Sequence, residues 1–582
     1  KGIYVGVPAP NGKVPAAIMP NLPTATEQID AFPYDPINMV TPTWNDNPGQ
    51  YYVDNSAACD DTNNGGRGSP LAPRCTIPGL ELRFRWTLEA GDQVFIVGNG
   101  QSYTPVRDAT VDRVDMRGTA TEPVWIIGVS NPSNPRWINQ PKLDFEFLGL
   151  GDATMMTHVV FDNVHFLNPD FRSSFVTNSD MTNRFEYFTV RHSTCSPTED
   201  AHAAGVESTK SRRCFSFVGA IENPVRFVML YDNDIFGRGH WPGDLNINTD
   251  IHGVQPQRAT YYFWYIANRS FHLQGDSIQC SNSNQKNLIF EQRPHYIYVA
   301  GNEFYENYEN AWDSKGCYHV VFSENYIHDF YNETKKANNS AIIAPNDDES
   351  YIGSNFEWYI NNRIERVGNA FSYKGTSEDA FVYFMGNFGV DIEYDVFPIE
   401  SRCLNNSVPT CADGMYAAQN TFDCGLKAAV VKATRNGSID PNIVPIEEQN
   451  QLINFSGNIF YNCIDAANAQ VPSPIGFEGI NANWIVTYEY NVDYRITGDL
   501  ALSKFNDIEV GNRTNIDPKF VNANGHLTGD YSLGPLSTVK RLVPVEATPY
   551  TQFRSMYGLD IREDINGKVW RSGAVLNPGA FQ

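Results

Sequence analysis

The feature that most constrains this chain is a short phrase that recurs along most of its length. Each copy is a run of β-branched and aromatic residues that ends in asparagine, as in VVFSEN. The copies end at Asn163, Asn233, Asn268, Asn302, Asn325, Asn362, Asn387, Asn420 and Asn458. Their spacing runs from 23 to 38 residues, apart from one gap of 70 residues after Asn163. Constant strands at variable spacing predict stacked rungs that are joined by loops of different length.

The runs alternate or are wholly apolar, which is typical of strands in a parallel sheet and not of helical repeats with a 3.6-residue period. A propeller would need four strands in an even period of about 40 to 50 residues. We therefore predict an all-β chain in the form of a parallel β-helix. Asparagine tolerates a left-handed bend, and its side chain can bond to the backbone of the next rung, so the repeated asparagine predicts a ladder. The long gap predicts a further rung at Arg184 to His192 (RFEYFTVRH).

Three other stretches carry a family resemblance. They are YYVDNSAACDDTNNGGRGSPLAPRCTIP (51–78), LEAGDQVFIVGNGQSYT (88–104) and the tail DIREDINGKVWRSGAVLNPGAFQ (560–582). Together with the rungs they resemble the secreted right-handed parallel β-helix proteins of the pectate-lyase-like superfamily. The resemblance implies a single-stranded right-handed parallel β-helix, a solenoid with long inserted loops. We expect an extension over residues 1–50, the β-helix with its cleft over 51–545, and a packed tail over 546–582.

Charge and cysteine content narrow the environment and the partners. The formal net charge of −24 argues against a nucleic-acid partner, because binding phosphates needs a basic surface. The sequence has no run of eighteen apolar residues, so we expect no membrane span. Four near pairs of cysteines favour an oxidising compartment, and we expect a secreted, monomeric protein. These pairs are Cys59 with Cys75, Cys195 with Cys214, Cys403 with Cys411, and Cys424 with Cys463.

Polar residues crowd three related phrases between residues 250 and 316. The phrases are DIHGVQP, GDSIQC and NAWDSKG, and laid over one another they align in columns. Gln255, Gln279 and Asp313 form one predicted column, and His252, Asp276 and Asn310 form another. Lys315 lies at the exit of the third strand. Lys374, in the later copy NAFSYKG, is expected near the same column. Neighbouring rungs are about 4.8 Å apart, so these polar side chains should lie close together. We therefore place the active site on these rungs.

The resemblance implies a polysaccharide lyase that cleaves an acidic glycan by β-elimination. Such an enzyme neutralises a uronate carboxylate, removes a proton and protonates the leaving oxygen. On that pattern Lys315 is the base and His252 is the alternative base or the acid. The predicted substrate-binding residues are Arg238, His240, Gln255, Arg258, Gln279, Trp312, Tyr373 and Lys374. The N-K-S and L-R-H-G motifs of the alginate and dermatan lyases of this fold are absent from the sequence.

Two alternatives stay open from the residues alone. Asp276 and Asp313 on successive rungs would lie about 7 to 8 Å apart diagonally, a separation that suits an inverting glycoside hydrolase. Either aspartate could instead cap a turn. The other alternative is a β-helix that binds carbohydrate without cleaving it.

A metal is a further expectation. GDLNINTD places side-chain oxygens at every second residue, at Asp244, Asn246, Asn248 and Asp250. Such spacing can wrap a calcium ion in a loop, although the glycine and closing glutamate of an EF-hand are missing. We expect no organic cofactor.

Overall fold

The computed structural model describes most of the chain from residue 37 onward. The described residues are 37–56, 58–62, 66–78, 87–103, 115–129, 140–144, 155–167, 170–172, 184–196, 213–221, 223–237, 251–281, 292–330, 340–346, 355–375, 381–401, 412–426, 429–435, 450–463, 475–477, 485–494, 508–526, 528–543, 548–557, 561, 565–566 and 576–581. They divide into two units. The N-terminal unit holds the described residues up to 275 together with 292–298, and the C-terminal unit holds 276–281 and those from 299 onward.

In the N-terminal unit the strands form three stacks of parallel strands, which we call the first, second and third faces. On each turn of the coil the chain passes through the faces in this order. The first face holds β1 (Gln50–Val53), β3 (Gln93–Val97), β6 (Val124–Val129), β8 (Met155–Asp162), β11 (Arg184–Arg191), β14 (Val225–Tyr231) and β17 (Thr260–Ile266), with β2 (Leu88–Glu89) and β5 (Asp115–Arg117) beside them. The second face holds β4 (Ser102–Tyr103), β7 (Lys142–Asp144), β9 (His165–Leu167), β12 (Thr194–Ser196), β15 (Asp234–Phe236) and β18 (Arg269–Phe271). The third face holds β10 (Asp170–Arg172), β13 (Arg213–Gly219) and β16 (His252–Arg258).

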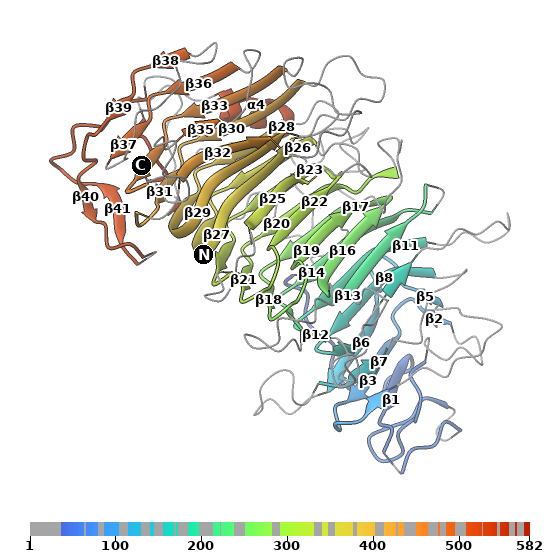
Figure 1. The fold of residues 1–582 in the computed structure, drawn as a ribbon. Helices are drawn as coiled ribbons and strands as arrows, with labels where there is room; N and C mark the ends of the chain where they lie inside the picture. The colour runs from blue at the N-terminus through green and yellow to red at the C-terminus, as the bar shows by residue number, and fades with distance from the viewer. Residues whose placement is uncertain are drawn as a thin grey trace. The chain divides into compact units, whose positions relative to one another are not determined.

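The C-terminal unit repeats this plan, and its first-face strands run side by side in Figure 1. That face holds β23 (Tyr318–Ser323), β26 (Asn355–Ile360), β28 (Phe381–Met385), β30 (Ala412–Ala418), β33 (Asn450–Ser456), β36 (Ile485–Glu489) and β38 (Ile508–Val510). The second face holds β21 (Glu303–Tyr305), β24 (Tyr326–His328), β31 (Thr421–Asp423), β34 (Ile459–Tyr461), β37 (Val492–Tyr494) and β39 (Arg513–Thr514). The third face holds β19 (Ile278–Ser281), β22 (Trp312–Lys315), β25 (Ser340–Asn346), β32 (Ala429–Arg435) and β35 (Ile475–Phe477), while the long strands β27 (Arg363–Gly375) and β29 (Phe388–Ser401) continue from the second face into the third. Strand β20 (His295–Ala300) has residues in both units.

This arrangement confirms the predicted parallel β-helix, and β11 is the rung expected in the long gap. The asparagine ladder is also present. In the C-terminal unit each ladder asparagine from Asn325 to Asn512 accepts hydrogen bonds from the backbone N–H and the side chain of the asparagine one rung before it, as Asn325 does from Asn302 at 3.0 and 2.9 Å. The ladder continues through Asn491 and Asn512, two members that the sequence pattern missed.

One detail of the ladder differs from the expectation. The left-handed residue is the one before the ladder asparagine, for example Glu324 with a φ of 55° and Gly386 with a φ of 65°. Asn163 is itself left-handed, so the ladder position on its rung is the next residue, Val164, and on β11's rung that position is Ser193. The asparagine thus makes the hydrogen bonds, and the residue before it makes the bend. The asparagine side chain bonds to both neighbouring rungs, so it must point along the stack.

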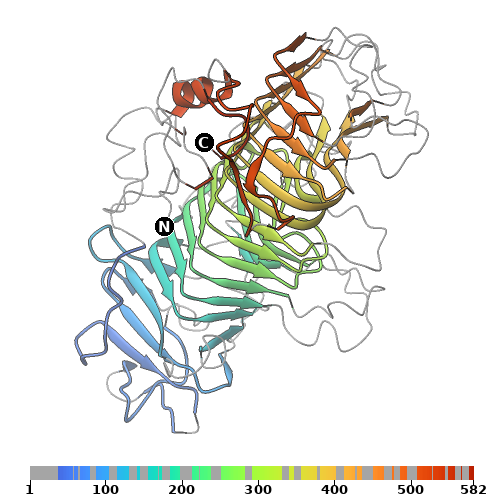
Figure 2. The same ribbon diagram turned by 90° about the vertical axis from the view of Figure 1, so that its left-hand side faces the viewer.

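Residues near both ends of the described chain pack on the rungs. Trp44 lies edge-on to Phe95 with ring centroids 5.6 Å apart. In the C-terminal unit, helix α4 (Thr548–Tyr557, Figure 2) lies against the first face. The rings of Phe553 and Trp358 meet there, with centroids 4.9 Å apart. None of the helices within the described ranges is long and apolar enough to cross a membrane.

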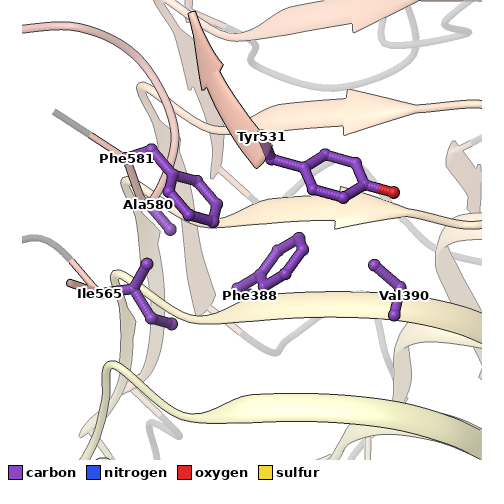
Figure 3. Packing of buried hydrophobic residues seen from close by; sticks show 6 residues of the cluster. All are labelled: Phe388, Val390, Tyr531, Ile565, Ala580 and Phe581. Carbon is purple, nitrogen blue, oxygen red and sulfur yellow. The ribbon is translucent and has the colours of Figure 1, made fainter. Parts of the chain in front are cut away.

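The last part of the chain covers the second face of the C-terminal unit. A hairpin of β40 (Phe520–Asn522) and β41 (Asp530–Leu533) is antiparallel. Its Tyr531 packs with Ile565, Ala580 and Phe581 over Phe388 and Val390 of β29 (Figure 3). These apolar contacts bury the outer side of a strand that would otherwise face water.

Four disulfides join described cysteines. Three of them, Cys59–Cys75, Cys195–Cys214 and Cys424–Cys463, are pairs expected from the sequence. The fourth joins Cys280 to Cys317, which are 37 residues apart, and proximity in sequence gave no sign of it. The expected pair Cys403–Cys411 lies outside the described residues.

Candidate functional site

The candidate site is built on two neighbouring third-face strands of the C-terminal unit, β19 and β22. Gln279 pairs with Asp313, as the overlay of the sequence repeats predicts, and Ser281 pairs with Lys315. Successive side chains of a strand point to opposite sides. Ile278, Cys280, Trp312 and Ser314 are fully buried in the interior of the coil. Gln279, Asp313, Ser281 and Lys315 therefore share the outer side.

Asp276 lies just before β19 and is held by hydrogen bonds. It has no exposed surface. Its Oδ1 accepts from the side-chain amide of Asn310 at 2.8 Å and from the backbone N–H of the same residue at 3.3 Å. Its Oδ2 accepts from the side-chain amide of Gln279 at 3.0 Å. A carboxylate that accepts several hydrogen bonds is stabilised in its ionised form, and its orientation is fixed.

A second carboxylate stands beside Asp276. An oxygen of Glu309 lies within 4.8 Å of an Asp276 oxygen, and the Glu309 side chain is half-buried. Sequence reasoning missed Glu309. The available signal was its position, because it directly precedes Asn310, the residue aligned with Asp276 in the repeat.

On the next rung Asp313 forms an ion pair with Lys315. The Lys315 Nζ lies 3.1 Å from Asp313 Oδ2, and the side chains are 21% and 4% exposed. The two residues are two positions apart on one strand, so both side chains lie on the same side of it. A lysine that acts as a general base must be free of its proton, whereas a carboxylate at this distance favours the charged ammonium. The pair is thus better suited to hydrogen bonding a substrate than to removing a proton from it.

Two of the expected substrate-binding residues point the wrong way. Trp312 has no exposed surface and packs against Phe322 with ring centroids 5.8 Å apart. Tyr373 is 2% exposed. Strand alternation turns both aromatic rings into the core, which corrects the expectation that they bind substrate. Lys374 is half-buried, and it pairs with Asn346 and Glu400 in the strand register.

Three further expected residues lie on β16 of the N-terminal unit. His252 and Gln255 are each 1% exposed, and Gln255 accepts a hydrogen bond from Gln257. Arg258 is half-buried and has a φ of 50°. That these residues share a cleft with Lys315 stays a prediction. Outside the described residues lie the expected substrate ligands Arg238 and His240 and the expected calcium ligands Asp244, Asn246, Asn248 and Asp250.

Comparison with known proteins returns only remote similarity. No protein-family model matches the chain, and no curated protein matches it. Among solved structures, the complex of XylC with xylose has a TM-score of 0.38 at 12% identity, over 92% of this chain and 98% of that one. A GH136 lacto-N-biosidase from Eubacterium ramulus has a TM-score of 0.36 at 12% identity, over 80% of this chain and 68% of that one. The catalytic domain of a GH87 α-1,3-glucanase with nigerose has a TM-score of 0.31 at 10% identity, over 82% and 71%. Similarities this remote transfer no activity to this chain.

Proposed function

We propose that this chain is a glycan-cleaving enzyme and that it acts as a glycoside hydrolase at Asp276 and Glu309. The observation that carries the proposal is the close approach of these two carboxylates, within 4.8 Å, in the loops that precede the third-face strands β19 and β22. Hydrolysis of a glycosidic bond uses two carboxyl groups that flank the bond, and retaining enzymes hold them about 5 to 5.5 Å apart.

The different surroundings of the two acids suggest their roles. Asp276 is buried and accepts hydrogen bonds from Asn310 and Gln279, so we assign it the negative charge that stabilises the sugar cation. Two carboxylates this close disfavour ionisation of both, and the pair retains a proton. Glu309, the more accessible of the two, gives that proton to the leaving oxygen and recovers one from water in the second step. Asp313 and Lys315 would bind substrate hydroxyls.

The test begins with a screen of neutral and acidic glycans for new reducing ends. Asp276→Asn and Glu309→Gln should each lower turnover by about a hundredfold or more, while Glu306→Gln on the same loop serves as the matched control. Chemical rescue then separates the roles. Azide should give a glycosyl azide with Asp276→Ala, whereas Glu309→Ala should keep activity only on substrates with good leaving groups. Full activity in both carboxylate variants would refute the hydrolase assignment.

The second candidate is the polysaccharide lyase that the sequence resemblance implies. The observation that favours it is the presence of Lys315 on the outer side of β22, one strand from Gln279. In that case an acidic glycan would bind with its carboxylate near Gln279, and Lys315 would remove the proton once its pairing with Asp313 is broken. The assay distinguishes the two reactions, because only a lyase forms an unsaturated, ultraviolet-absorbing product end. Near-normal turnover of Lys315→Ala on such a substrate would exclude the lysine as base.

We also propose that the protein works outside the cytoplasm. Four disulfides among the described cysteines support this, since disulfides persist in oxidising compartments. The test is peptide mapping by mass spectrometry, without reduction, of the protein that its natural host produces. Free thiols at these eight positions would contradict it.

A further inference from the structure

A fully buried carboxylate lies in the coil interior directly behind the candidate site. Glu357 is on β26, on the first face, and has no exposed surface. In the strand register it stands between Val320 and Val382, which are also fully buried. An acid in a column of valines is costly unless hydrogen bonds compensate for the lost water. The presence of an acid at this position therefore points to a role that a third valine could not fill.

The contacts of Glu357 connect it to the strand that carries Asp313 and Lys315. Its Oε1 accepts a hydrogen bond from the Ser314 hydroxyl, and its Oε2 accepts one from the Tyr359 hydroxyl at 3.1 Å. Ser314 is the residue between Asp313 and Lys315 on β22, so it points inward where they point outward. Glu357 thus reaches from the first face across the interior and holds the inner side of β22.

The chemistry of the contact explains why an acid is used. A carboxylate accepts hydrogen bonds from two hydroxyl groups without bringing a donor that needs its own partner, whereas glutamine would turn an amide N–H₂ toward one of them. Burial raises the pKa of Tyr359, and the neighbouring Glu357 carboxylate raises it further, so Tyr359 remains a donor.

We propose that Glu357 is a positioning residue for the candidate site: by anchoring Ser314 it fixes β22 so that Asp313 and Lys315 stay paired on the outer side. The expected effect on catalysis rests on the proposed function, whereas the anchoring of β22 by Glu357 does not. If the anchor is lost, β22 is free to shift, and a misplacement of about 1 Å at a site can cost on the order of a hundredfold in rate.

The variants Ser314→Ala and Glu357→Gln test the anchor, and Asp493→Asn is the matched control. Asp493 is also a fully buried carboxylate that accepts from a tyrosine hydroxyl, Tyr488 at 2.6 Å, but its strand β37 pairs with β34 and β39. Two readouts are taken on the full-length protein. One is kcat and KM on the glycan that the wild type cleaves, and the other is the acylation rate of Lys315 relative to Lys374, followed by mass spectrometry.

Both anchor variants should lower kcat about tenfold or more with a smaller change in KM, and Lys315 should be acylated severalfold faster. Asp493→Asn should change neither, although it lowers stability. Unchanged Lys315 acylation in both anchor variants, or an equal change in the control, would overturn the proposal. If Glu357→Gln does not fold, Ser314→Ala decides alone, since it removes a single hydroxyl. If the wild type cleaves no glycan but Lys315 is still acylated faster in the anchor variants, the proposed function is refuted and the structural role of Glu357 stands.

Discussion

The asparagine ladder makes a quantitative prediction at its centre. Asn387 is fully buried. Its Nδ2 donates to the Tyr359 carbonyl and to Asn420 Oδ1, each at 2.9 Å. Its Oδ1 accepts from the backbone N–H of Asn362 at 2.9 Å and from the Asn362 side chain at 3.0 Å. Replacing it with leucine, which has a similar size, removes all of these bonds without opening a large cavity.

The magnitude follows from the groups that lose a partner. In Asn387→Leu the Asn362 backbone N–H and the Tyr359 carbonyl both lose their side-chain partner in a dry interior. Each such group costs about 1–3 kcal/mol, so the free energy of unfolding should fall by about 2–6 kcal/mol. Because rungs contact only their neighbours, the loss should also appear locally, as faster hydrogen exchange at the amides of β26 and β28.

The control is the same substitution at the end of the ladder. Asn512 accepts from the backbone N–H of Asn491 at 3.0 Å and donates to the Tyr488 carbonyl at 2.7 Å, but its side chain is half-buried. Water can replace its bonds, so Asn512→Leu should cost less than about 1.5 kcal/mol. Guanidinium unfolding and hydrogen exchange compare the two variants. Equal losses, or a loss at Asn387 below about 1 kcal/mol, would refute the reasoning.

Three further predictions concern stability. Cys280→Ser with Cys317→Ser should lower the free energy of unfolding by about 3–4 kcal/mol in the chain-entropy estimate for a loop of 37 residues, measured by denaturant unfolding. Burial lowers the pKa of His328, but its hydrogen bonds to Glu303 and Asp329 raise it more, and the net pKa is raised. Its contribution is therefore present below the unfolded pKa of about 6.5 and lost as pH rises through the folded pKa, so His328→Gln should destabilise more at low pH than at high pH in urea unfolding. If residues 244–250 bind calcium, chelation should lower the thermal midpoint and Asp244→Ala should abolish that response; equal midpoints would exclude the site.

The sequence alone determined the parallel β-helix. Strand runs that end in asparagine predict parallel rungs, and the rung of β11, which lacks the mark, could be placed from the length of the gap. The pairing of Gln279 with Asp313 also followed from the repeats, because a repeated phrase keeps its register from rung to rung. The residue before each ladder asparagine sets a local bend of the backbone. Such a bend depends on few neighbouring residues, so the local sequence can indicate it.

Only the tertiary structure decided which side each residue faces and what lies behind it. Trp312 and Tyr373 were expected outside and lie in the core, because a shift of one residue reverses the side of a strand. Glu309 comes from a loop whose path no periodicity describes, and it reaches Asp276 only in the folded chain. Glu357 is 43 residues from Ser314 in sequence and joins it across the interior. Contacts across the coil depend on how rungs stack, and the spacing of a strand pattern carries no information about them.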